Sequence, residues 1–248
     1  MTTKRAAPPG KAPEDAQGRP VGRRVVLSLL GLGAVGIVGG ARVQSVVGGA
    51  VAQLQSSDPT GLSELVPGGD GFRYYTVVAD DPKVSAAQYR LSVSGYVSSP
   101  KTLTMSDLAA LPQTSLVKDF QCVTGWRVPQ VHWSGVRLSD LLDSVGTTAA
   151  ATAVRFTSLD GTYTESLTMA QARRPDVLVA TSMLGGPVSG NHGGPVRLYV
   201  APMYGYKSLK WLGGIELVDK VEPGYWEQEG YDVDGWIGRS NGRDDAPV

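Results

Sequence analysis

Short apolar runs, each broken by glycine or proline, limit the folds open to this chain more than any other feature. Residues 88–97 alternate apolar and polar side chains, which predicts a strand with one buried face. Residues 153–159 and 162–167 flank Asp160-Gly161, a dipeptide typical of a tight β-hairpin turn. The sequence shows no internal repeat and no long amphipathic helix. It therefore predicts an α+β domain that is rich in short strands.

The other predicted elements are also short. Strands or extended segments are expected at 72–78, 177–181, 196–200 and 215–218. Helices are expected from the Thr104-Met-Ser-Asp107 capping box to Pro112, from a Ser139 cap to Gly146, and over 169–173. The tail from 225 to 238 is aromatic and acidic, and it shows little periodicity.

The N-terminus has the pattern of an export signal. Residues 1–22 are rich in alanine, proline, glycine and charge, and are predicted to be disordered because they cannot bury enough apolar surface. Arg23-Arg24 then precedes an uncharged apolar run, residues 25–41, which indicates twin-arginine export. Ala50-Val-Ala52 is a candidate cleavage site. Because 17 uncharged residues are the short limit for a spanning helix, an uncleaved membrane anchor is the alternative.

Composition and charge narrow the function further. Lys+Arg and Asp+Glu number 23 each, so the chain has no electrostatic footprint for nucleic acid or acidic membranes. We divide it into the N-terminal signal or anchor 1–52, a polar linker 53–71, and a single folded domain 72–248. An exported chain with one cysteine cannot form an intramolecular disulfide, and its thiol is open to oxidation unless it is buried or occupied.

That cysteine, Cys122, follows an apolar run, and glycine and proline come soon after it. It is therefore expected where an extended segment ends and a loop begins, a place where scaffolds present reactive side chains. Three roles are open: a small buried hydrophobe, a nucleophile paired with His132 or His192, or a thiolate that ligates a metal. One cysteine and two histidines are too few for a zinc cage, so most ligands of a metal would come from a cofactor.

Two glycine-rich or basic loops could hold an anion. Asn191-His-Gly-Gly-Pro195 with Arg197 offers backbone amides and two cationic side chains, although an ordinary glycine-rich turn is the alternative. The segment 204–211 interleaves two lysines and a serine with aromatic residues, although lysines on a solvated turn are common. Together with the lone thiol, the two loops suggest a phosphate-bearing cofactor.

Three ordered motifs in these regions resemble the sulfite-oxidase family of molybdenum enzymes. They are Phe120-Gln-Cys-Val-Thr-Gly-Trp126, Trp133-Ser-Gly-Val-Arg-Leu-Ser-Asp-Leu-Leu142, and His192-Gly-Gly-Pro-Val-Arg197 followed by Tyr204-Gly-Tyr-Lys-Ser-Leu-Lys210. Within the family, the chain is most similar to the exported catalytic subunit of the bacterial periplasmic methionine sulfoxide reductase. The resemblance covers residues 72–218 and implies a strand-rich, sulfite-oxidase-type molybdopterin-binding fold.

The resemblance also implies the cofactor, one molybdenum ion held by one molybdopterin, with Cys122 as the catalytic and metal-ligating residue. A soft thiolate suits such an ion. The residues implied as further cofactor contacts are Tyr75, Thr76, Thr157, His192, Arg197, Ser208, Leu209 and Lys210. Within this set, His192 and Arg197 would meet the phosphate and the pterin edge, and 208–210 would close over the phosphate.

The activity that the family implies is two-electron oxygen-atom transfer outside the cytoplasm, here the reduction of S- or N-oxides such as methionine sulfoxide. Electrons would come from a membrane haem- or quinol-linked partner subunit. Thr124 and Gly125 depart from the reductase pattern, which more often has acidic and alanine residues there, and His192 replaces an asparagine. Sulfite oxidation therefore stays open as an alternative. From another class, a cofactor-free secreted binding module with Cys122 in its core is also open.

Overall fold

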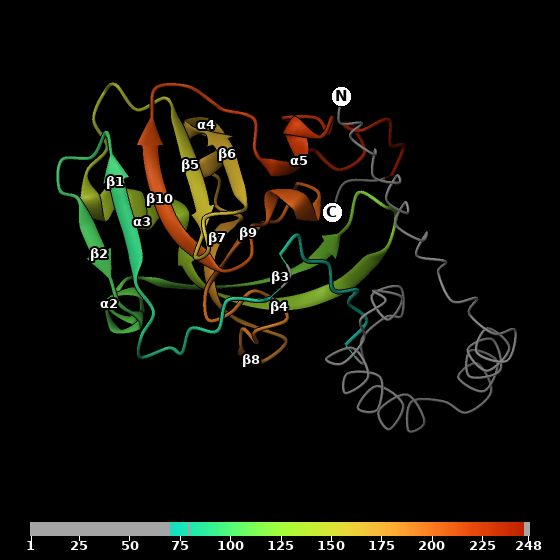
Figure 1. Ribbon diagram of the computed structural model, residues 1–248, viewed down its shortest axis with the longest axis horizontal. Coiled ribbons are helices and arrows are strands. Elements are labelled where there is room, and N and C mark those ends of the chain that lie inside the picture. The colour runs from blue at the N-terminus through green and yellow to red at the C-terminus, as the bar shows by residue number, and fades with distance from the viewer. Residues whose placement is uncertain (1–69, 79, 246–248) are drawn as a thin grey trace, which may run out of the picture.

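Two β-sheets form the framework of the computed structural model, which describes residues 70–78 and 80–245 (Figure 1). The first sheet has the strand order β2-β1-β10-β5-β6. Its strands are β1 (Leu91–Gly95), β2 (Lys101–Leu103), β5 (Ala153–Ser158), β6 (Thr164–Thr168) and β10 (Leu212–Val218). β1 and β10 pair in parallel, whereas the other neighbours are antiparallel. The predicted α+β, strand-rich class is confirmed.

The second sheet contains the long hairpin that leads to Cys122. Its order is β3-β4-β7-β8, and β9 pairs with β7. The strands are β3 (Gln113–Gln121), β4 (Arg127–Arg137), β7 (Val177–Met183), β8 (Gly186–Pro187) and β9 (Arg197–Val200). In Figure 1 the β3–β4 hairpin runs below the first sheet and extends beyond it on the right.

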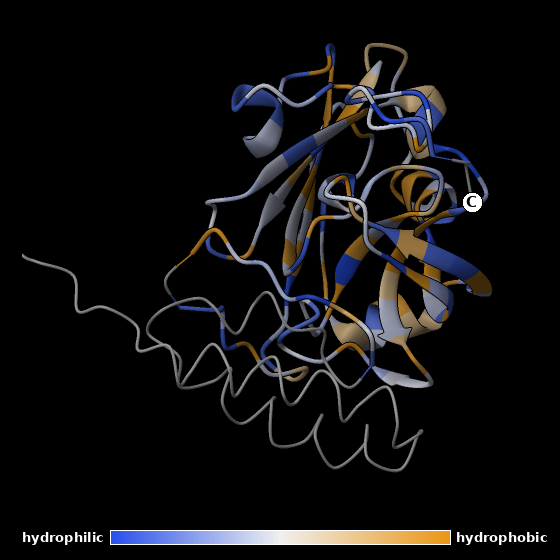
Figure 2. Cartoon of the chain, turned by 90° about the vertical axis from the view of Figure 1, so that its right-hand side faces the viewer, coloured by the Kyte–Doolittle hydropathy of each residue, from blue (hydrophilic) through white to orange (hydrophobic). Residues whose placement is uncertain are grey.

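The sequence of β7 explains how the core is divided. Val177 and Val179 pack into the larger apolar cluster, which the first sheet also lines. Leu178 and Ala180 pack into a second cluster with residues of β3, β4 and β9. Because successive side chains of a strand point to opposite faces, this uninterrupted apolar run is buried on both sides. In Figure 2 hydrophobic residues recur along the strands, with hydrophilic ones between them.

Short helices connect the strands, and those predicted after Thr104, before Gly146 and over 169–173 are present. They are α2 (Met105–Ala110), α3 (Leu138–Val145), α4 (Met169–Ala172), the 3₁₀ helix η2 (Gly205–Lys207) and α5 (Tyr225–Gln228). The capping box of Thr104 and Asp107 is formed, and Gly146 ends α3 with a positive φ of 69°. The Ser139 cap is wrong, because α3 begins earlier, with Arg137 at the cap, and the Ser139 hydroxyl donates to Asp140.

Other elements begin or end at residues that differ from the prediction, because tertiary packing sets these boundaries. β10 begins at Leu212, so Gly213 and Gly214 lie inside the strand rather than before it. A Cβ on Gly213 would come within 2.8 Å of the Leu159 Cα, so only glycine fits this close approach. Residues 72–78 form no regular strand, and the tail contains the short helix α5.

The predicted export signal, with its apolar run 25–41, and most of the predicted linker lie outside the described residues. Among the residues that are described, no helix is long and apolar enough to cross a membrane. Asp70 and Gly71, at the end of the predicted linker, belong to the described part, and Asp70 contacts His192.

Candidate active site around Cys122

Cys122 lies in the tight turn between β3 and β4, so the predicted strand end is confirmed. The last β3 residue, Gln121, pairs with Arg127, the first residue of β4. Within the turn, the Cys122 N–H donates to the Trp126 carbonyl at 2.9 Å, and the Gly125 N–H donates to the Cys122 carbonyl at 3.0 Å. Gly125 adopts a φ of +102°, which glycine adopts without strain. The hairpin therefore holds the sulfur in a defined place.

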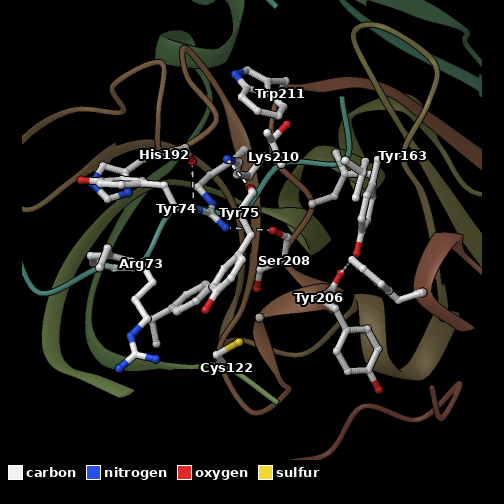
Figure 3. A pocket seen from close by; sticks show the side chains of 18 of the residues that line it. Arg73, Tyr74, Tyr75, Cys122, Tyr163, His192, Tyr206, Ser208, Lys210 and Trp211 are labelled. Atoms are coloured by element: carbon white, nitrogen blue, oxygen red, sulfur yellow. Dashed lines mark hydrogen bonds between the residues drawn. The ribbon is translucent and has the colours of Figure 1, made fainter. Parts of the chain in front are cut away.

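The half-buried Cys122 lines a cavity of about 310 Å³ (Figure 3). All the predicted site residues except Thr157 line this cavity with it. They come from four segments, residues 72–78, the Cys122 turn, the 191–197 loop and residues 205–211. Thr157 is not among the lining residues, whereas its strand neighbour Ser158 is. The structure thus brings eight of nine predicted residues together, while their roles as cofactor contacts stay predictions.

Aromatic side chains to which the sequence assigned no role of their own make up much of the wall. The cavity is lined by Phe72, Tyr74, Phe120, Trp126, Tyr163, Tyr206, Trp211, Trp226 and Tyr231. Trp126 stacks against Phe120 with ring centroids 5.7 Å apart. These aromatic residues follow no regular spacing in the sequence. Only the folded structure shows that they line one cavity.

Arg197 is a buried cation without an acidic partner among the described residues. Its Nη1 donates to the His192 carbonyl and its Nη2 to the Ser208 carbonyl, each at 2.8 Å. The guanidinium also lies over the Phe120 ring, 5.4 Å from the centroid. Burial lowers the pKa of Arg197 to about 10, so it remains charged at neutral pH. A buried, uncompensated positive charge in a cavity wall favours an anionic ligand.

His192 is fixed by Asp70, a residue that the sequence placed in the linker. Its Nε2 lies 2.7 Å from Asp70 Oδ2, which also accepts from the Tyr74 hydroxyl at 2.7 Å. Burial opposes ionisation of Asp70, but bonds from His192, Tyr74 and the Phe72 N–H outweigh it and lower its pKa to about 2. Since a carboxylate only accepts, the His192 Nε2 carries the hydrogen.

Lys210 ties the N-terminal wall to the glycine-rich loop. Its ammonium donates to the Tyr75 carbonyl and to the Asn191 carbonyl, each at 3.0 Å, and lies over the Trp211 ring. The Ser208 hydroxyl accepts from the Val200 N–H at 3.0 Å. The predicted 208–210 segment is therefore a structural part of the wall.

A fully buried ion network lies behind the C-terminal wall. The Lys207 ammonium donates to Glu165 at 2.5 Å, to Glu227, and to the Ser166 and Val233 carbonyls at 3.0 and 2.9 Å. Burial, together with the charge of Glu227, raises the pKa of Glu165 to about 8, although Lys207 opposes the shift. The network joins β6, η2 and α5, and sequence reasoning had treated Lys207 only as part of a basic loop.

The nucleophile alternative finds no support in the geometry. His192 is engaged by Asp70 and Tyr74, and His132 is exposed on β4 and does not line the cavity. Among the described residues, the hydrogen bond to the Cys122 sulfur comes from the Thr124 hydroxyl at 3.2 Å.

These side chains fit the molybdopterin cofactor that the resemblance implies. Cys122 supplies a thiol to the cavity, and Arg197 supplies the buried charge for a phosphate. The Trp126 Nε1–H is buried and forms no hydrogen bond with any described residue, although its ring lines the cavity. Buried donors in proteins are nearly always paired, so this orphaned N–H indicates a ligand with an acceptor.

Comparison with known proteins agrees with this assignment. The model of the oxidoreductase molybdopterin binding domain matches residues 78–226. The chain is similar to a putative protein-methionine-sulfoxide reductase subunit YedZ1 of Azospira oryzae, 34% identical over 188 residues, 74% of this chain and 70% of that protein. It is also similar to the sulfite oxidase of Arabidopsis thaliana, 29% identical over 177 residues, 58% of this chain and 45% of that protein.

A solved structure supports the fold. The sulfane dehydrogenase SoxCD from Paracoccus pantotrophus matches with a TM-score of 0.52 and 24% identity, over 57% of this chain and 41% of that chain. The predicted sulfite-oxidase-type fold is therefore confirmed, and the cofactor-free binding module is contradicted. The chain belongs to the oxidoreductase molybdopterin-binding family, and it is a molybdenum-dependent oxidoreductase related to the sulfite oxidases.

Proposed function

We propose that this oxidoreductase reduces S- or N-oxides by two-electron oxygen-atom transfer, with protein-bound methionine sulfoxide as its substrate. The reaction consumes two electrons and two protons for each sulfoxide, and yields a thioether and water. The proposal depends on one observation: the Cys122 sulfur lines an aromatic-walled cavity. The wall of this cavity also contains the buried Arg197, which has no acidic partner among the described residues. The name of the Azospira relative supports this substrate class.

The residues of this chain would hold the cofactor in distinct ways. Cys122 would ligate the molybdenum, Arg197 would pair with the phosphate, and the Trp126 N–H would donate to an acceptor of the cofactor. When bound, the molybdenum supplies the oxygen-atom transfer chemistry. His192, held by Asp70, would present its ring to the same ligand.

The aromatic wall has its own part in the reaction. Tyr75, Trp126 and Tyr231 line the same cavity as Cys122, and their rings would limit the access of bulk water to a bound substrate. The methyl group and side-chain carbons of methionine sulfoxide would contact these rings, while its polar oxygen would face the metal. A neutral oxide with apolar substituents should therefore be favoured over a small, strongly hydrated anion.

An activity panel tests the proposal. Protein matured in a host that makes molybdopterin should contain about one molybdenum per chain and reduce free and peptide-bound methionine sulfoxide with a reduced dye. Cys122→Ser should lose the metal and the activity, and Thr102→Ala, at an exposed position of β2 outside the cavity, is the control. Stoichiometric molybdenum in Cys122→Ser, or wild-type protein inactive on every oxide, would contradict the proposal.

Sulfite oxidation is the second candidate. Sulfite and water would yield sulfate, two electrons and two protons. Arg73 favours this reading, because it lines the cavity and its guanidinium forms no hydrogen bond or ion pair with a described residue. The plant sulfite oxidase relative points the same way. Sulfite-dependent reduction of an oxidised dye, lost in Arg73→Met, would favour this direction.

Location and partner complete the proposal. The protein acts outside the cytoplasm after twin-arginine export, with its N-terminal segment cleaved or retained as an anchor, as the Arg23-Arg24 pattern supports. A membrane haem- or quinol-linked subunit delivers the electrons.

A further inference from the structure

The Thr124 hydroxyl oxygen lies 3.2 Å from the Cys122 sulfur and donates its hydrogen to it. This hydroxyl forms no other hydrogen bond with a described residue. We propose that Thr124 is a positioning residue that, through this bond, sets how strongly the Cys122 thiolate donates to molybdenum. The inference rests on the proposed role of Cys122 as the metal ligand.

Backbone hydrogen bonds hold Thr124 over the sulfur. The Cys122 N–H bond to Trp126 closes the turn, and the Gly125 N–H bond to the Cys122 carbonyl tightens it. Thr124 lies between these two bonds, so its Cα has little freedom to move away from the thiol. Threonine is branched at Cβ, which further limits the orientations of its hydroxyl.

The neighbouring residue, Val123, holds the turn against the rest of the domain. Val123 is buried and packs with Tyr204, Tyr206 and Ile237. It therefore anchors the turn to the C-terminal part of the domain. Thr124 is exposed, unlike Val123, and lines the same cavity as Cys122. Its hydroxyl thus reaches the sulfur from the open side of the turn, where it makes few packing contacts that a substitution would disturb.

A hydrogen bond to a thiolate withdraws electron density from sulfur. A weaker sulfur donor stabilises the oxidised, higher-valent metal less, so the bond should raise the reduction potential of the centre. Bonds to charged groups are stronger than neutral ones. Losing one hydrogen bond of ordinary strength should change the equilibrium constant for one-electron reduction of the centre by about three- to tenfold.

Two substitutions separate the hydroxyl from the shape of the side chain. Thr124→Val keeps the branched shape and removes the donor, whereas Thr124→Ser keeps the donor and removes the methyl group. With the holoprotein, molybdenum content, the sulfur-to-metal charge-transfer absorption band and the midpoint potential would be measured. The potential comes from redox titration followed by the paramagnetic resonance of the one-electron-reduced metal.

We expect Thr124→Val to bind molybdenum and to shift the charge-transfer band. Its midpoint potential should be lower than that of wild type, by an amount that corresponds to about a three- to tenfold smaller equilibrium constant for reduction. Thr124→Ser should match wild type in both. Loss of molybdenum in Thr124→Val alone, with an unchanged melting temperature, would also support a hydroxyl role. The inference is overturned if Thr124→Val matches wild type, or if Thr124→Ser departs from wild type as far as Thr124→Val does.

Two controls tell this inference apart from the proposed function. If wild type lacks molybdenum, or Cys122→Ser keeps the charge-transfer band, the proposed ligand is wrong and the Thr124 inference falls with it. If both controls behave as expected and Thr124→Val is silent, Cys122 remains the ligand and only the Thr124 inference fails.

Discussion

Arg197 shows how a single side chain can serve structure and ligand together. Its guanidinium satisfies the His192 and Ser208 carbonyls and still leaves an uncompensated charge in the cavity wall. Removing Arg197 should therefore have two separate effects. Its hydrogen bonds to the two carbonyls exist with or without cofactor, so their loss affects the stability of both forms. Charge pairing matters only when an anion is bound.

Arg197→Met should therefore destabilise even the cofactor-free protein, by about 2–4 kcal/mol, since two buried carbonyls lose their donors. It should also abolish molybdenum retention. Urea unfolding and metal analysis would measure the two effects. Arg73→Met is the matched control, because Arg73 lines the same cavity without a bond to a described residue. Unchanged stability of apo Arg197→Met would contradict this account.

Among the elements, the segment 70–76 depends on contacts far away in sequence. Asp70 holds His192, 122 positions away, and Lys210 holds the Tyr75 carbonyl. The segment has no strand partner, so these side chains substitute for a hydrogen-bonded ladder.

Asp70→Asn should loosen this segment while leaving the two sheets intact, because the amide is a weaker acceptor than the carboxylate. Faster hydrogen exchange at residues 71–76, with a change in unfolding free energy of about 1–2 kcal/mol, is the expected result. Exposed Asp80 gives a control in Asp80→Asn. Protection of 71–76 equal to wild type would show that Asp70 is dispensable.

The pKa of Asp70 gives the pH range of this contact. Because the folded pKa is lowered to about 2 from 3.8, the contribution is complete above pH 3.8 and is lost as the pH falls through 2. The segment should therefore stay attached throughout ordinary acidic conditions.

Elements with local signals could be predicted from the sequence. The Asp160-Gly161 hairpin and the Thr104 capping box depend on residues within a few positions of one another, and both formed as expected. The start of α3 could not be predicted, because the entry from β4 decides it. In the site, family motifs located Cys122, but the bond between Asp70 and His192 joins a segment with no regular pattern to a loop. Such pairs depend on tertiary structure alone.

For the whole molecule, the Lys207 network couples three parts of the chain. Two carboxylates surround one ammonium, and Tyr163 lies close enough for the charges of Glu165 and Glu227 to raise its pKa, after burial itself. Removing Lys207 would leave the buried Glu227 carboxylate, and Glu165 whenever it is ionised, without a cationic partner. Breaking a buried pair in this way typically costs about 3–5 kcal/mol.

Global stability should consequently depend on pH through Glu165. Its pKa is raised from 4.5 to about 8 in the folded protein, so the folded state binds the extra proton between these values. The contribution is fully present below pH 4.5 and is lost as the pH rises through 8. Glu165→Gln should flatten the fall in melting temperature over this range, whereas Glu216→Gln, on the exposed side of β10, should not. An equally steep fall in Glu165→Gln would contradict the assignment.

The cavity wall draws on residues as far apart as Phe72 and Tyr231. During translation, a nascent chain that has been synthesised only as far as β9 lacks the parts of the cavity wall that η2 and α5 supply. Lys207 and its partner Glu227 are also absent at this stage. No partial chain can offer the complete pocket. We therefore expect a ligand that needs the complete pocket to be inserted only after nearly the whole domain has left the ribosome.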